Sequence, residues 1–267
     1  MVISVIFCKF TLKAGKSSKF AQEFFYIAKT FGIMAVILNI ETSTNVCSVA
    51  VTDNGLVLEH FEDFKGQNHA ALLSGYINDC IEYLKSHDLK LEAVAVSIGP
   101  GSYTGLRIGL SEAKGLAYAL DIPIIGIDTL KLMACSVMFH HDINPDALFV
   151  PMLDARRMEV YTSVLDMSLA ELMGPTPLIL DEDSYEQFLN DHEIIFFGNG
   201  SDKAKDVIKH SNARFIPGIY PLASDLLALA EMAFRKQDFL DLAYSVPAYL
   251  KDFQATKPKS MIKCRRK

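Results

Sequence analysis

From residue 99 to 119 the chain reads Gly99-Pro-Gly-Ser-Tyr-Thr-Gly-Leu-Arg-Ile-Gly-Leu-Ser-Glu-Ala-Lys-Gly-Leu-Ala-Tyr-Ala119. The apolar run 91–98 before it predicts a buried strand, which Gly99-Pro100-Gly101 must end. Ser102 or Thr104 is then placed to cap a helix. A strand, a glycine-rich turn and a helix N-terminus can form an anion-binding nest. An ordinary tight turn fits the same residues, and no Walker A motif is present.

The helix predicted after this turn contains an unusual number of glycines. Each glycine inside a helix costs roughly 1 kcal/mol relative to alanine. Gly105, Gly109 and Gly115 therefore indicate that another part of the protein approaches the helix closely. The close neighbour is either the sheet of the same domain or a helix of a partner.

Length, composition and charge narrow the class of protein. The chain has 267 residues, half of them hydrophobic, and a formal net charge of −6. No apolar run approaches the ~18 residues that a membrane-spanning helix needs. Five scattered cysteines without a CxxC pair predict reduced thiols rather than disulfides or a zinc site. We therefore expect a cytoplasmic protein that has no membrane partner and does not wrap nucleic acid unaided.

The order of predicted elements suggests four segments. Residues 34–140 predict a first α/β lobe, and residues 141–251 repeat its hairpin, strand and helix order in a second, reduced lobe with a C-terminal helix. A cleft is expected between the two lobes. Residues 1–33 form an N-terminal extension with five lysines and one glutamate, so either Met34 is the functional start or the extension is genuine. Residues 252–267 form a basic tail that we expect to be disordered.

Several motifs together resemble the TsaB (YeaZ) family. They are Gly99–Gly109, Ile37–Val51, Asp154–Tyr161, Gly198–Gly200 and Pro247–Leu250, so the likeness spans roughly residues 34–251. The resemblance implies a two-lobed actin/Hsp70/sugar-kinase-like (ASKHA) fold. It also implies a non-catalytic subunit that works with a TsaD-like catalytic subunit and a TsaE-like ATPase. Together they would transfer threonylcarbamoyl to N6 of adenosine 37 in tRNA, which this acidic chain need not touch directly. The alternative within the same fold is an ATP-dependent small-molecule kinase or ATPase.

The expected cleft offers few residues for chemistry. Glu41 and Asp154 end the first strand of each lobe, so both carboxylates are expected to face the cleft. Thr42 and Ser43 would form a phosphate turn beside them, although we favour the simpler interpretation that these polar residues satisfy a hairpin turn. His69 has leucine four residues later, so the His-x-x-x-His metal pair of TsaD is absent. We assign no catalytic residue, no metal site and no cofactor.

Two helices are predicted to form a partner surface. The apolar arc of the helix from His69 to Leu84 is broader than packing on a sheet requires. The resemblance implies that this helix and the glycine-rich helix 104–120 mediate dimerisation, with TsaD or with a second copy of the chain when TsaD is absent. The predicted interface residues are His69, Leu72, Tyr76, Tyr83, Gly105, Leu106, Gly109, Leu110 and Gly115.

Overall fold

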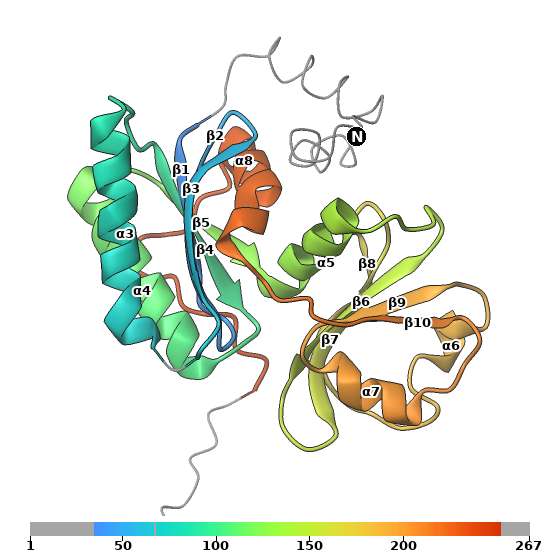
Figure 1. Ribbon diagram of the computed structural model, residues 1–267. Helices are drawn as coiled ribbons and strands as arrows, with labels where there is room; N and C mark the ends of the chain where they lie inside the picture. Colours follow the sequence, from blue (N-terminus) through green and yellow to red (C-terminus); the bar gives the residue numbers. More distant parts are fainter. Residues whose placement is uncertain (1–34, 67, 252–267) are drawn as a thin grey trace, which may run out of the picture.

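The computed structural model describes residues 35–66 and 68–251, which form two α/β lobes (Figure 1). The predictions for the extension 1–33, for Met34 and for the tail 252–267 lie outside the described residues. Each lobe is built on a five-stranded mixed sheet, with strand orders β3-β2-β1-β4-β5 and β10-β9-β6-β7-β8. The strands of the first sheet are β1 (Ile37–Glu41), β2 (Cys47–Asp53), β3 (Leu56–Asp63), β4 (Ala93–Gly99) and β5 (Ile124–Asp128). Those of the second are β6 (Leu148–Asp154), β7 (Glu159–Leu165), β8 (Glu171–Ile179), β9 (Ile194–Phe197) and β10 (Ala213–Ile216).

The second sheet repeats the pairing of the first. β1 pairs antiparallel with β2 and parallel with β4, and β6 pairs in the same way with β7 and β9. The helices of the second lobe are shorter: α6 (Glu186–Leu189) and α7 (Ser201–Val207), against α3 (His69–Ser86) and α4 (Tyr103–Leu120) in the first. The expected fold class, a two-lobed α/β protein of the actin/Hsp70/sugar-kinase-like type with a reduced second lobe, is confirmed.

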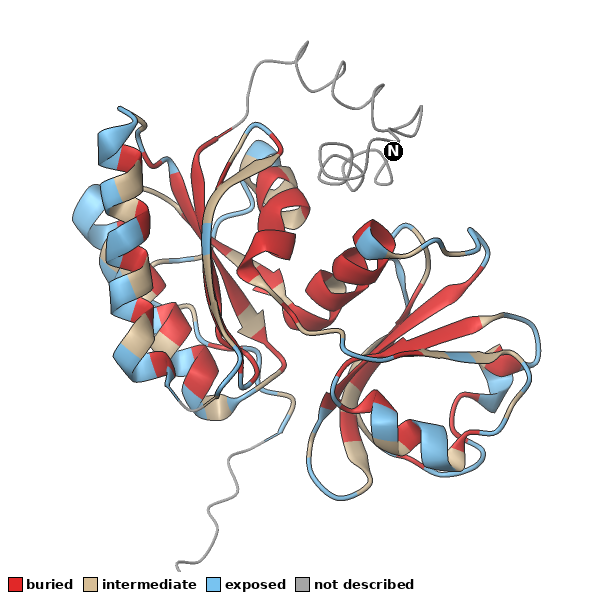
Figure 2. Ribbon diagram, in the orientation of Figure 1, coloured by how far each residue is buried: buried red, intermediate tan, exposed pale blue. Residues whose placement is uncertain are grey.

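The first sheet is covered on both faces, which explains its nearly unbroken apolar strands (Figure 2). Successive residues of β1 point to opposite faces. Leu38 and Ile40 pack with the cluster under α3 and α4, whereas Ile37 packs with Leu226 and Ala230 on the other side. That other side is covered by η2 (Ala223–Leu226) and α8 (Leu227–Lys236).

Helix α8 therefore lies on the first lobe, although chain order had placed it with the second. It contacts β1 and β5. Its Glu231 side chain accepts a hydrogen bond from the Gly55 amide of the first lobe at 2.8 Å. The long-range apolar contact of Ala230 with Ile37 decides this position, and no local sequence signal reports it.

Helix α5 (Thr129–His140) connects the lobes. The Asp128 side chain caps it by accepting a hydrogen bond from the Lys131 amide at 2.8 Å. The helix contacts strands of both sheets, so it is buried along nearly its whole length (Figure 2).

After α8 the chain runs back along the first lobe as an irregular segment, residues 238–251, which we call the C-terminal strap (Figure 1). The Leu240 amide donates to the Ile124 carbonyl of β5 at 2.8 Å, and the Ala248 amide to the Ile98 carbonyl of β4 at 2.7 Å. Lys114 of α4 donates to the Ser245 carbonyl at 2.7 Å. The strap thus fixes the C-terminal motif 247–250 beside the glycine-rich turn.

Candidate functional site

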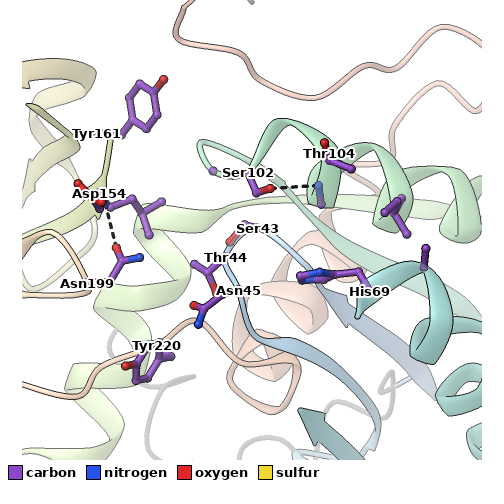
Figure 3. Close-up of a pocket in the computed structure, with 15 residues that line it drawn as sticks. Ser43, Thr44, Asn45, His69, Ser102, Thr104, Asp154, Tyr161, Asn199 and Tyr220 are labelled. Atoms are coloured by element: carbon purple, nitrogen blue, oxygen red, sulfur yellow. Dashed lines mark hydrogen bonds between the residues drawn. The ribbon is translucent and has the colours of Figure 1, made fainter. Parts of the chain in front are cut away.

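A cavity of about 790 Å³ lies between the lobes (Figure 3). In the first lobe its walls come from the β1–β2 turn, the start of α3 and the β4–α4 turn. In the second lobe they come from the end of β6, from β7 and from two loops. The polar lining residues include Ser43, Thr44, Asn45, His69, Ser102, Thr104, Asp154, Tyr161, Asn199 and Tyr220. The predicted cleft between the lobes is therefore present.

The glycine-rich turn and helix pack tightly against the β1–β2 turn of their own lobe. A Cβ atom on Gly105 would lie 2.1 Å from the Thr42 carbonyl oxygen, and one on Gly109 would lie 2.2 Å from Thr42 Oγ1. The Thr42 hydroxyl donates a hydrogen bond to the Gly105 carbonyl at 2.8 Å. Gly105 and Gly109 are therefore explained by close packing within their own lobe rather than by a partner helix.

The β4–α4 turn uses part of its hydrogen-bonding capacity internally. The Ser102 amide donates to the Ser43 carbonyl at 2.6 Å, and the Ser102 hydroxyl accepts from the Gly105 amide at 3.2 Å. Ser102 is therefore the cap of α4, as one of the two predicted candidates. Its amide is not free to bind an anion, which favours the tight-turn interpretation for this part of the turn.

Glu41 does not face the cleft. The residue is fully buried and is not among those that line the cavity. Its Oε1 accepts a hydrogen bond from the Ser43 amide at 2.5 Å. Desolvation by burial raises the pKa of the Glu41 carboxyl to about 7, against the opposing effect of hydrogen bonding from Ser43. Glu41 and Asp154 were both expected to face the cleft, and only Asp154 does. The last side chain of β1, Glu41, points into the lobe instead.

Asp154 does line the cavity, but a lysine neutralises it. Lys203 Nζ lies 2.5 Å from Asp154 Oδ1 and also donates to the carbonyls of Arg157 and Glu159. The Asn199 side chain accepts from the Asp154 amide at 2.9 Å (Figure 3). Lys203 was not predicted from the sequence. The sequence feature that could have identified Lys203 is its position in the first turn of the helix after the Gly198-Asn199-Gly200 motif.

His69 is buried at the start of α3, where its Nε2 lies 3.2 Å from the Val46 carbonyl oxygen. Leu73, one turn later, belongs to the apolar core under the helix. Among residues 35–66 and 68–251, no three histidine, cysteine, aspartate or glutamate side chains come close enough to hold a metal ion. The same described residues include no helix long and apolar enough to cross a membrane.

The predicted partner residues divide into two groups. Gly105, Leu106, Gly109 and Leu110 are buried in the first lobe. Leu72, Tyr76 and Tyr83 are half-buried on α3, and Gly115 is exposed on α4. Tyr76 stacks on Phe61 with ring centroids 5.3 Å apart. Tyr83 stacks on His87 at 4.1 Å.

The outer face of α3 and α4 is lined by small side chains. A Cβ atom on Gly75 or Gly115 would meet no other atom of residues 35–66 and 68–251 within 4 Å. Ser74 of α3 donates to Glu112 of α4 at 2.6 Å, which holds the two helices side by side. Gly75 was missed in the sequence analysis, although its place on the same helix as Leu72 was a usable signal.

A second cavity, of about 300 Å³, adjoins the first and shares Gly101, Asp154 and Tyr161 with it. Its other walls come from the β6–β7 hairpin and from the end of the C-terminal strap. Tyr103 stacks on Tyr249 of the strap with ring centroids 4.9 Å apart. The sequence analysis did not identify this recess, because the strap that closes it lies far along the chain.

Comparison with known proteins gives a consistent result. The family model described as "TsaD: tRNA N6-adenosine threonylcarbamoyltransferase" matches residues 63–259. The chain is 30% identical over 176 residues to the tRNA threonylcarbamoyladenosine biosynthesis protein TsaB of Bacillus subtilis, covering 65% of this chain and 75% of that one. It is 29% identical over 227 residues to TsaB of Escherichia coli, covering 83% and 96%. The crystal structure of YeaZ from Pseudomonas aeruginosa superposes with a TM-score of 0.69 at 24% identity, over 81% of this chain and all of that one.

Proposed function

Because the chain belongs to the TsaB (YeaZ) family, whose curated members are biosynthesis proteins for tRNA threonylcarbamoyladenosine, we propose that it is a non-catalytic scaffold subunit of that pathway. Its main partner is a TsaD-like catalytic subunit, and a TsaE-like ATPase is a third component. The assembled complex transfers threonylcarbamoyl to N6 of adenosine 37 in tRNA. In the absence of the TsaD-like subunit the same surface pairs two copies of this chain.

The observation that carries this proposal is the outer face of α3 and α4. Gly75 and Gly115 are exposed, and the space beside each is open. Small residues allow the backbone of a second helix to approach closely, and the flanking Leu72 supplies apolar area. Among the described residues no contact requires glycine at these two positions, in contrast to Gly105 and Gly109. A partner helix that packs on this face would explain why positions 75 and 115 are glycine.

The cleft gives less support to the kinase alternative. A magnesium–nucleotide site needs carboxylates free to face the metal and the phosphates. Glu41 is buried in its own lobe, and Asp154 is engaged by Lys203. Neither carboxylate is positioned as that chemistry requires, so we favour the scaffold role.

The test is co-purification with the TsaD-like protein of the same organism, using Gly75→Leu and Gly115→Leu. Each adds a large side chain into open space and replaces glycine with a better helix former, so the isolated chain should melt at or slightly above the temperature of the unmodified chain. Each should weaken association at least tenfold, because the leucine holds the partner helix away. Lys205→Leu, on exposed α7 of the second lobe, adds a similar side chain and should associate as the unmodified protein does.

A second readout separates the scaffold from the kinase. Reconstituted tRNA modification should require this chain together with its partners, and the isolated chain should show no ATP turnover. ATP turnover by the isolated chain that is abolished by Asp154→Asn would establish the kinase alternative. Unchanged association of both glycine variants would show that this face is not the interface.

A further inference from the structure

The turn between β6 and β7 holds two consecutive arginines in an unusual backbone conformation. Arg156 has a φ of 71° and Arg157 a φ of 51°, in the left-handed region where asparagine and glycine are favoured. The turn is held from inside by Asp154, which accepts from the Arg156 amide at 3.0 Å, and by Lys203, which donates to the Arg157 carbonyl at 2.8 Å. We call Arg156 and Arg157 the arginine turn.

Both side chains of the arginine turn point outward. The two residues are exposed, and neither guanidinium group has an ion-pair partner among residues 35–66 and 68–251. The nearby acids are already neutralised: Asp154 pairs with Lys203, and Glu159 pairs with Lys251. The two guanidinium groups therefore add positive charge at a turn whose Arg156 lines the smaller cavity.

This positive charge borders an aromatic recess. Arg156 lines the 300 Å³ cavity together with Lys251, Tyr161 and Tyr249. Tyr103 is covered by Tyr249 and by the Arg107 guanidinium, which lies 4.1 Å from the centre of its ring. Tyr161 packs partly against the apolar core, but it has no stacked ring or cation among the described residues and it borders both cavities.

The charge of the described part of the chain makes this recess stand out. Residues 35–251 contain 30 acidic and 15 basic side chains, so this part of the chain is strongly acidic. A polyanion is repelled by most of such a surface. The chain that continues from Lys251 reverses this balance, with six basic and no acidic residues between 257 and 267.

We propose that the arginine turn and the recess beside it bind an unpaired nucleotide of an RNA loop. The two guanidinium groups contact backbone phosphates, and a base stacks on Tyr161. Guanidinium–phosphate contacts combined with base stacking on aromatic rings are the usual means of binding single-stranded RNA. This inference rests on the proposed function, which makes a tRNA the substrate of the complex. It adds a direct contact between that tRNA and this chain.

The experiment measures binding of the full-length chain to a fluorescent RNA stem-loop by anisotropy over a range of salt concentrations. Arg156→Asn/Arg157→Gly removes both guanidinium groups while placing residues favoured at positive φ, so the turn should remain folded. We expect affinity at low salt to fall about tenfold. The slope of log K against log salt should fall by about 1.4, since each lost phosphate contact contributes about 0.7. Tyr161→Leu should weaken binding about fivefold without changing the slope.

The matched control is Lys90→Asn/Lys205→Asn, which removes two exposed positive charges elsewhere and should change affinity less than twofold. Unchanged binding by the arginine variant, or an equal loss in the control, would overturn the proposal. Displacement of the RNA by poly-glutamate as readily as by unlabelled RNA would also overturn it, since the site would then recognise charge alone.

Co-purification of the arginine variant with the TsaD-like protein tests the scaffold role separately from the RNA contact. If the arginine variant loses no RNA affinity but the chain still co-purifies with the TsaD-like protein, the RNA proposal is wrong and the scaffold role stands. If the unmodified chain does not co-purify with that protein, the scaffold role is wrong. The salt dependence of RNA binding then still tests the RNA contact by itself.

Discussion

Two glycine-to-alanine changes in one helix should have opposite effects on stability. At Gly105 the new methyl group would lie 2.1 Å from the Thr42 carbonyl oxygen, about 1 Å closer than ordinary contact allows. Overpacking of this kind costs about 1–3 kcal/mol, and displacement of the turn also weakens the Thr42–Gly105 hydrogen bond, worth about 1 kcal/mol. The better helix propensity of alanine returns about 1 kcal/mol. Gly105→Ala should therefore destabilise the protein by about 2 kcal/mol.

At Gly115 the added methyl group meets no atom of the described part of the chain, so only the gain in helix propensity remains, about 1 kcal/mol. For a protein of this size 1 kcal/mol shifts the melting temperature by about 2–4 °C. Gly105→Ala should therefore melt about 4–8 °C lower than the unmodified chain, and Gly115→Ala about 2–4 °C higher. Differential scanning calorimetry on the isolated proteins measures both. If Gly105→Ala melts at or above the unmodified temperature, the contact with Thr42 is not the reason for glycine at that position.

Three further predictions address the buried acid, the hairpin and the strap. Because the pKa of Glu41 is raised to about 7, the folded state binds a proton more tightly than the unfolded state, so stability should fall as pH rises from about 5 to 7. Denaturant titrations at pH 5 and pH 8 give the unfolding free energy at each pH, and Glu41→Gln should reduce the difference between them by roughly 3 kcal/mol. The same difference in the variant and the unmodified protein would show that Glu41 does not cause the pH dependence. Lys203→Met removes the contacts with Asp154 and with two carbonyls, so it should lower the free energy of unfolding by about 1–2 kcal/mol. It should also speed amide hydrogen exchange in the β6–β7 turn, and an unchanged exchange rate would contradict the structural role of Lys203. Tyr249→Ala removes the stack on Tyr103, so the Ala248 amide should exchange faster with little change in melting temperature, and equal protection would show that the strap is held elsewhere.

The sequence was sufficient for the parts of the fold that depend on local pattern. The apolar run 91–98 predicted a strand, Ser102 was one of the two predicted caps, and the repeated order of elements predicted two lobes. These features depend on residues close together in the chain, where propensity and periodicity act.

The candidate site was predicted less completely, because it depends on contacts between distant residues. The direction of the last side chain of β1 is set by sheet register, so Glu41 could not be placed from its position in the strand alone. The need for Gly105 and Gly109 arises from Thr42, more than 60 residues earlier. The recess lined by Arg156, Tyr161 and Tyr249 requires two lobes and the strap to come together.

The docking of η2 and α8 on the first sheet has a consequence for synthesis on the ribosome. The second sheet is formed by a continuous stretch of chain, β6 to β10, whereas the first lobe needs residues from both ends of the described chain. One face of the first sheet, which includes Ile37, therefore stays only partly covered, by α5, until η2 and α8 leave the exit tunnel. The second lobe can complete its own sheet before the first is closed. During that interval the exposed apolar face is a target for chaperones and for aggregation, so slow translation between residues 141 and 236 would lengthen the vulnerable period.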